Sequence, residues 1–166
     1  LFDNIEKARD VYVHHVSQNH TIDLLVDCDV DGYTSGANIY QYTKRINPSI
    51  EIRCFIHSGK VHGLSEFIDS MCSDNSDLVI IPDAGSGNWS ECKRLIDSGK
   101  DVIILDHHSI DTSGNPAIVI NNQSSKNITD KAMTGVGITY KFTKLLDKYY
   151  KVNYADDYLD LVALGM

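Results

Sequence analysis

Three short segments of the chain combine carboxylate and imidazole side chains at a spacing that could bind divalent cations. They are Asp27-Cys28-Asp29-Val30-Asp31-Gly32, Asp83-Ala84-Gly85 and Asp106-His107-His108. Each segment directly follows an apolar run that is typical of a buried strand, at 22–26, 78–82 and 102–105. Because ligands gather outside the carboxyl ends of parallel strands, these side chains are expected to meet at one edge of a sheet. Clustered acids repel one another unless cations neutralise them, and this favours a metal-dependent hydrolase.

The types of the side chains indicate which ion such a site would bind. In an extended segment, Asp27, Asp29 and Asp31 would project to one face, since residues two apart share a face of a strand. Asp83 and His107 would arrive from neighbouring strand ends. Oxygen ligands with imidazole and without thiolate suit Mn²⁺ or Mg²⁺ better than a structural zinc. A carboxylate shared by two ions ~3.5–4 Å apart is the usual core of a two-metal phosphoryl hydrolase.

The strongest competing motif is the calcium-binding EF-hand loop. Its first, third, fifth and sixth positions are matched by Asp27, Asp29, Asp31 and Gly32. The twelfth position should be a glutamate, but Asn38 stands there, and the preceding segment has the pattern of a strand rather than a helix. An isolated Asp-rich turn or His pair is more often solvated surface. Three acids that end three apolar runs are much harder to produce by chance, and the metal-site interpretation is therefore favoured.

The segments between the expected strands have helical periodicity. The whole pattern predicts a three-layer α/β/α domain with a mainly parallel sheet of about five strands. Strands are expected at 22–26, 50–56, 78–82, 102–105 and 117–120, and helices at 1–17, 34–46, 64–71, 88–98, 138–149 and 156–166. Gly32 would let the backbone turn sharply into the second helix, which Thr34 or Ser35 could cap.

Composition limits the classes of function that remain. The 166 residues fit one domain, and 15 Lys+Arg against 23 Asp+Glu give a net charge of −8, which argues against a basic face for gripping nucleic acid. The four cysteines lack metal-binding spacing and favour reduced thiols and a cytoplasmic location. No run of ~18 apolar residues exists, so no membrane association is expected.

The three segments, in this order, resemble the first three motifs of the DHH phosphoesterases. The resemblance is strongest to the RecJ-type branch of single-strand-specific exonucleases, and segments 119–123, 135–142 and 158–165 support that branch. It implies a DHH catalytic domain over residues 1–166 that ends before the family's fourth motif and its C-terminal substrate-binding domain. It also implies stepwise hydrolysis of single-stranded DNA from the 5′ end with two Mn²⁺ ions, or with Mg²⁺.

The resemblance also implies roles for individual residues. The implied metal ligands are Asp29, Asp31, Asp83 and His107, with Asp83 shared by two ions and Asp27 as a further ligand or an organiser of the others. His108 would contact the scissile phosphate, so that Asp83, His107 and His108 form the catalytic group. Asp106 would orient the histidines. Lys60 and His62, in the loop 58–63, would face the substrate.

Two other functions stay open. A DHH hydrolase of short oligonucleotides or cyclic dinucleotides would use the same ligands and would need no basic channel. A catalytically silent scaffold relative is suggested by Leu25, which stands where many family members have a histidine. The expected partners are single-stranded DNA or a short oligonucleotide, together with proteins of DNA repair or replication.

Overall fold

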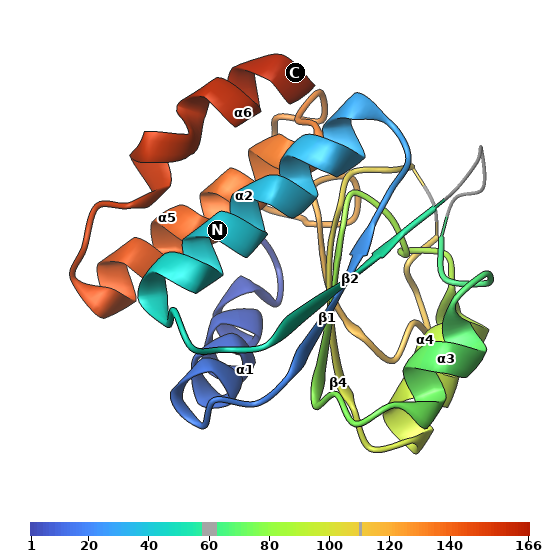
Figure 1. The fold of residues 1–166 in the computed structure, drawn as a ribbon. Coiled ribbons are helices and arrows are strands. Elements are labelled where there is room, and N and C mark those ends of the chain that lie inside the picture. The colour runs from blue at the N-terminus through green and yellow to red at the C-terminus, as the bar shows by residue number, and fades with distance from the viewer. Residues whose placement is uncertain (58–62, 110) are drawn as a thin grey trace.

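The computed structural model describes residues 1–57, 63–109 and 111–166 and has three layers, with a sheet between two groups of helices (Figure 1). Its five strands are all parallel and lie in the order β2-β1-β3-β4-β5. Their bounds are β1 Ile22–Val26, β2 Ile52–Ile56, β3 Leu78–Pro82, β4 Asp101–Asp106 and β5 Ile118–Asn121. The predicted α/β architecture is confirmed.

Helices cover both faces of the sheet (Figure 1). One face carries α1 (Ile5–Ser17), α2 (Val30–Ile46), α5 (Gly135–Tyr150), the short 3-10 helix η1 (Ala155–Tyr158) and α6 (Leu159–Gly165). The other face carries α3 (Ile68–Ser73) and α4 (Trp89–Asp97). Among the described residues, no helix combines the length and the apolarity that crossing a bilayer needs.

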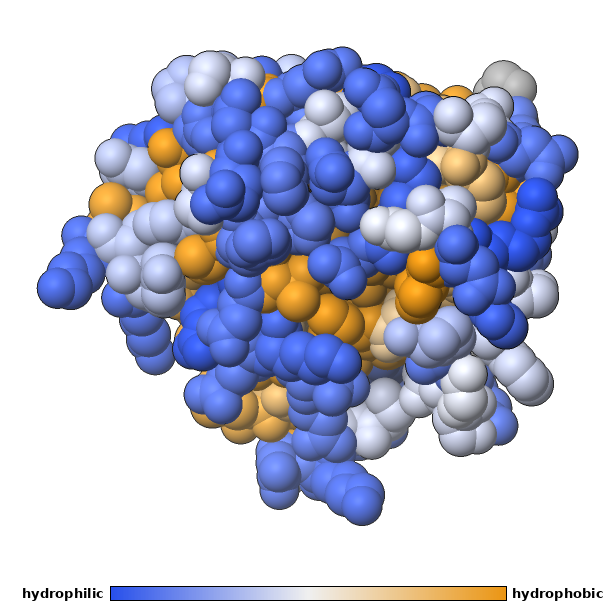
Figure 2. Space-filling view, turned by 90° about the horizontal axis from the view of Figure 1, so that it is seen from below, coloured by the Kyte–Doolittle hydropathy of each residue, from blue (hydrophilic) through white to orange (hydrophobic). Residues whose placement is uncertain are grey.

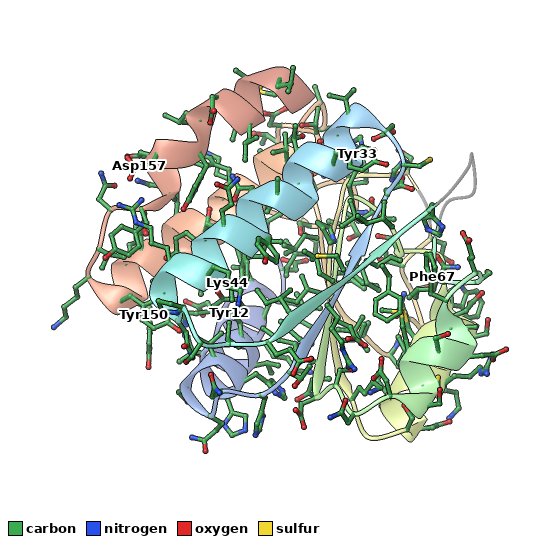
Figure 3. The ribbon with its side chains drawn as sticks, in the orientation of Figure 1. Tyr12, Tyr33, Lys44, Phe67, Tyr150 and Asp157 are labelled. Atoms are coloured by element: carbon green, nitrogen blue, oxygen red, sulfur yellow. The ribbon has the colours of Figure 1, made fainter. Side chains whose placement is uncertain are left out.

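The buried strands supply side chains to two separate cores, because successive residues of a strand point to opposite faces. In β1, Leu24 packs on the α1, α2 and α5 side, whereas Leu25 packs on the α3 and α4 side. Ile103 and Ile104 of β4 divide in the same way. Tyr12 of α1 is fully buried in the first core, where Figure 3 shows it beneath α2. Two-sided burial explains why these strands are mainly apolar.

Helix α2 begins earlier than the sequence predicted. Asp29 is its N-cap, and the Asp29 side chain accepts a hydrogen bond of 2.9 Å from the backbone N–H of Gly32. The predictions of an extended triple-Asp segment and of a cap after Gly32 were therefore wrong, because an aspartate cap satisfies a helix amide that would otherwise be unpaired. Gly32 lies inside the helix, and a Cβ there would lie 2.6 Å from Asp27 Cβ. Close approach of α2 to Asp27, rather than a sharp turn, requires this glycine.

Candidate metal centre

Acidic residues from three adjacent strands meet at one edge of the sheet. Asp27 follows β1, Asp83 follows β3, and Asp106 is the last residue of β4. All three are buried, with exposed fractions of 2%, 1% and 0% respectively. Asp83 has a φ of 64°, in the left-handed region that residues other than glycine seldom adopt. Strain of this kind persists only where the surrounding structure holds it, and it is concentrated at functional sites.

Two groups of potential metal ligands share Asp83. One ligand atom each from Asp27, Asp29 and Asp83 lie within 4.8 Å of one another, and the same holds for Asp83, His107 and His108. His107 Nε2 lies 3.2 Å from Asp83 Oδ1. A carboxylate common to two ligand groups has the position that a bridging ligand of two cations requires.

Asp31 lies beside these groups and is held by the start of α5. The backbone N–H of Gly135 donates to Asp31 Oδ2 at 2.7 Å, and that of Val136 donates to Oδ1 at 2.8 Å. The exposed amides and the positive end of the helix dipole favour a carboxylate at this point. His107 Nε2 lies 3.6 Å from Asp31 Oδ2. Oδ1 also accepts a hydrogen bond of 3.5 Å from Ser35 Oγ, whereas Oδ2 keeps a further lone pair, with which Asp31 can bind an ion while α5 fixes its orientation.

Gly135 allows α5 to approach the ligands this closely. A Cβ at this position would lie 2.3 Å from Asp83 Oδ1 and 2.6 Å from Asp83 Cβ. No larger residue fits without displacing the shared carboxylate. Sequence reasoning gave no role to this helix start, and its only local signal was the Gly135-Val136-Gly137 segment that supported the family resemblance.

Asp106 organises the two histidines that follow it. Its Oδ1 accepts hydrogen bonds of 2.7 Å from His108 Nδ1 and from the backbone N–H of His107, and its Oδ2 accepts one from the backbone N–H of Ser86. The hydrogen bond to Asp106 raises the pKa of His108 to about 9. Although burial opposes it, the hydrogen bonds from His108 and Ser86 lower the pKa of Asp106 to about 2. His108 is therefore held as a cation near neutral pH.

Asn121, at the end of β5, is a further organising residue that sequence reasoning missed. Its Nδ2 donates to the backbone oxygen of His108 at 3.0 Å and to Ser86 Oγ at 3.1 Å. It therefore supports the segment that carries His108. The signal available in the sequence was the same as for the acids, a polar residue that ends an apolar run.

The chemistry of Asp83 fits a divalent cation. Burial raises the pKa of its carboxyl group to about 7; His107 opposes this shift, and Asp31 and Asp29 add to it. Within the described ranges, buried Asp83 Oδ1 accepts no hydrogen bond of good geometry, although His107 Nε2 is close. A buried carboxylate oxygen that faces other acids is stabilised when a cation binds it. Oxygen and imidazole donors without thiolate suit Mn²⁺ or Mg²⁺.

Comparison with known proteins places the chain in a family. The family described as "DHH family, N-terminal domain" matches residues 21–166. The chain belongs to the DHH family. YorK, a prophage-derived protein of Bacillus subtilis (strain 168) whose name marks it as a presumed single-strand DNA-specific exonuclease, is 43% identical over 163 residues, which cover 98% of this chain and 28% of YorK. The single-stranded-DNA-specific exonuclease RecJ of Thermus thermophilus is 25% identical over 141 residues, which cover 84% of this chain and 21% of that protein.

Solved structures share the DHH fold. RecJ of Thermus thermophilus in complex with Mn²⁺ has a TM-score of 0.85 and 23% identity, over 99% of this chain and 24% of that one. An exonuclease RecJ bound to manganese has a TM-score of 0.89 and 23% identity, and the match covers 99% of this chain and 43% of that one. The chain thus spans less than half the length of these RecJ structures and 28% of YorK.

Not every residue singled out in the sequence can be placed at this DHH centre. Lys60 and His62 lie outside the described residues. Leu25 is 1% exposed and packs in the core beside α3 and α4. Leu25, where the family resemblance leads one to expect a histidine, therefore supplies packing.

Proposed function

We propose that this chain is the catalytic domain of a RecJ-like exonuclease that hydrolyses single-stranded DNA from the 5′ end. The observation that carries the proposal is that buried Asp83 lies close to Asp27 and Asp29 on one side and to His107 on the other. The names of YorK and RecJ support DNA as the substrate. Since the chain spans 28% of YorK and 21% of RecJ, the activity of the whole protein is part of the proposal.

Two divalent cations, Mn²⁺ or Mg²⁺, would be held by the clustered acids and one imidazole. The proposed ligands are Asp27, Asp29, Asp31, Asp83 and His107. RecJ of Thermus thermophilus has been crystallised with each of these ions, which supports either choice. When bound, such ions lower the pKa of a water molecule and neutralise charge that develops on a phosphate.

The side chains of this chain would position the substrate around that centre. His108, kept cationic by Asp106, would donate a hydrogen bond to an oxygen of the scissile phosphate, and charge-assisted bonds of this type are strong. Gly135 and Val136 would keep Asp31 in place through their backbone N–H groups. Lys60 and His62 are proposed to meet the strand from the loop 58–63.

The net charge of −8 leaves little basic surface for a DNA backbone. By the family resemblance, a C-terminal substrate-binding domain would supply that grip, and the fourth motif would supply a last metal ligand. Cytoplasmic DNA repair or replication, with partner proteins of those processes, is the proposed setting. The same acidic net charge favours short oligonucleotides or cyclic dinucleotides as the second candidate substrates.

The test is Mn²⁺-dependent cleavage of a 5′-labelled single strand by the protein that contains this chain, with Asp83→Ala beside it. Release of labelled mononucleotide that is lost in Asp83→Ala supports the proposal. An intact strand together with cleaved dinucleotides selects the second candidate. Intact substrates of every kind contradict both and point to a scaffold role.

A further inference from the structure

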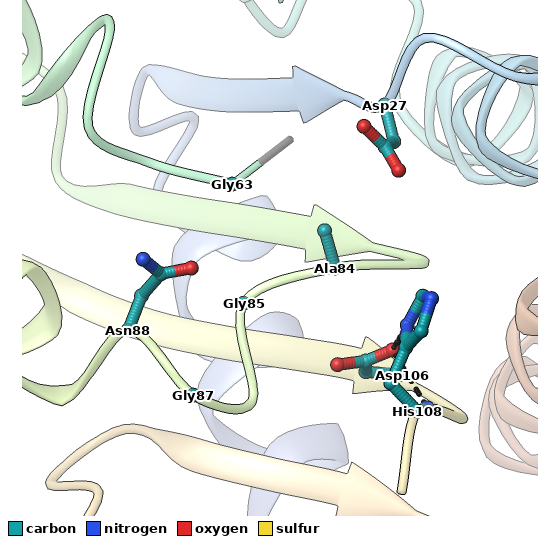
Figure 4. Close-up of a pocket in the computed structure, with 8 residues that line it drawn as sticks. All are labelled: Asp27, Gly63, Ala84, Gly85, Gly87, Asn88, Asp106 and His108. Atoms are coloured by element: carbon teal, nitrogen blue, oxygen red, sulfur yellow. Dashed lines mark hydrogen bonds and ion pairs between the residues drawn. The ribbon is translucent and has the colours of Figure 1, made fainter. Parts of the chain in front are cut away.

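A cavity of about 440 Å³ opens beside the metal-binding residues (Figure 4). Asp27, Asp106 and His108 line one side of it, and Asn88 lies across from them. Its remaining lining residues are Gly63, Ala84, Gly85 and Gly87. The volume falls in the range of small-molecule sites, roughly 300–1,000 Å³. The cavity therefore joins the end proposed to bind phosphate to a polar side chain that the hydrolysis does not use.

The wall between these two ends carries almost no side chains. Gly85 has a φ of 97° and Gly63 a φ of 83°, conformations that L side chains rarely adopt. A Cβ on Gly63 would also lie 2.6 Å from Asn88 Oδ1. Gly63 therefore packs against the Asn88 amide without placing a side chain over it. A flat ring could pack against the exposed peptide groups of this wall without displacing a side chain.

Asn88 occupies the N-cap position of α4 without capping the helix. An asparagine there ordinarily accepts a hydrogen bond from an amide of the first turn, but the Asn88 side chain makes no such bond. Its backbone is fixed instead, since its N–H donates to the oxygen of Gly85 at 3.0 Å and its oxygen accepts from Cys92 at 2.9 Å. The side chain also interacts with Glu91, and Figure 4 shows Oδ1 directed toward the cavity. A carbonyl oxygen there accepts from N–H donors and repels phosphate.

We propose that this cavity binds the nucleobase next to the reacting phosphate, and that Asn88 Oδ1 accepts a hydrogen bond from an N–H of that base. The inference rests on the proposed phosphodiesterase function, since a phosphate at the metal end fixes where the base can lie. All four DNA bases carry an N–H donor on the pairing edge that is free in a single strand. The contact can therefore form with any of the four bases, as an enzyme that removes successive nucleotides requires.

The test compares wild type and Asn88→Ala on two 5′-labelled strands. The strands are identical except that, in one, both residues flanking the first phosphodiester are abasic. Asn88→Ala is expected to lower kcat/KM on the base-bearing strand about 5-fold, the effect of one hydrogen bond, and to leave the abasic strand unchanged. Asn127→Ala, at an exposed asparagine between β5 and α5, is the matched control and should change neither value.

Each remaining outcome overturns the inference. Equal losses on both strands would mean that Asn88 acts only through the structure, and unchanged rates on both would mean that it contacts no base. In both cases the Mn²⁺- and Asp83-dependent cleavage stands, so the proposed function survives. If wild type cleaves neither strand, the proposed function itself fails and the inference falls with it.

Discussion

Both edges of the sheet bury aspartates, but only the acids of the amino edge form ion pairs with lysines or arginines among the described residues. There, Asp23 is 0% exposed, Arg53 Nη2 lies 2.9 Å from its Oδ1, and Ser76 Oγ donates to its Oδ2 at 2.8 Å. Lys100, which is 4% exposed, lies 2.8 Å from Asp74 Oδ1. Figure 2 views the molecule from below, toward this edge, where hydrophilic side chains gather between apolar patches.

The acids of the carboxyl edge differ in their partners. Within the described ranges, no lysine or arginine forms an ion pair with Asp29, Asp31 or Asp83. Burial raises the pKa of Asp83 to about 7. Burial also acts to raise the pKa of Asp74, but the hydrogen bonds from Lys100 and Ser76, together with the interaction with Asp23, lower it. Buried acids that the chain neutralises itself support the fold, and acids left without a cation indicate a site for an external one.

The largest predicted effect comes from removing the shared acid of the carboxyl edge. Asp83→Asn should lower Mn²⁺-dependent hydrolysis at least ~10³-fold, because the neutral amide cannot hold the cations. The metal-free fold should be at least as stable, since a buried carboxyl group that resists ionisation is lost. Initial rates and thermal unfolding measure the two effects. Asp97→Asn, at a side chain that is 61% exposed on α4, should alter neither.

Breaking a pair at the amino edge should act on stability alone. Lys100→Met should lower the free energy of unfolding by about 3 kcal/mol, because Asp74 and Ser76 lose a buried cationic donor. Denaturant titration checks this, with Lys93→Met as the control at a side chain that is 68% exposed. Unfolding free energies for the two variants that agree to within about 0.5 kcal/mol would contradict the comparison, as would lost Mn²⁺ affinity.

Crowding the carboxyl edge without replacing a ligand should have an intermediate effect. A Cβ on Gly135 would meet Asp83 Oδ1 at 2.3 Å, so Gly135→Ala should weaken Mn²⁺ binding about 10–100-fold, as loss of a supporting contact does. The matched variant Gly137→Ala places its Cβ against the flexible side chain of Met133 and should bind normally. Calorimetric titration with Mn²⁺ measures the affinity of both variants. Equal affinities would contradict the claim that the close approach of α5 supports the metal centre.

A smaller effect is expected from pH. Because the pKa of Asp83 is raised to about 7, Mn²⁺ must displace a proton at lower pH, and affinity should fall up to about tenfold per pH unit below 7. In the metal-free protein, the native carboxyl group takes up its proton before the unfolded one does. Asp83 therefore adds stability as pH falls from 7 toward its usual pKa of 3.8. Affinity that is constant between pH 8 and pH 6 would contradict this account.

The sequence predicted what depends on local pattern. Mainly apolar runs that end at Asp27, Asp83 and Asp106 predicted parallel strands and one shared edge, because burial on both faces favours apolar residues at successive positions. The predicted start of α2 was wrong because an aspartate can serve either as a metal ligand or as a helix N-cap. Only the folded chain shows that Asp29 caps the helix. The bond between Gly135 and Asp31 spans 104 residues, and no local pattern marks a backbone N–H for so distant a contact.

Calorimetric titration of the chain with Mn²⁺ tests the central claim most directly, because it needs no substrate. Saturable binding that Asp83→Asn abolishes and Asp97→Asn preserves is the predicted result. Absence of binding, or binding that Asp83→Asn leaves intact, would contradict a metal centre at the carboxyl edge of the sheet.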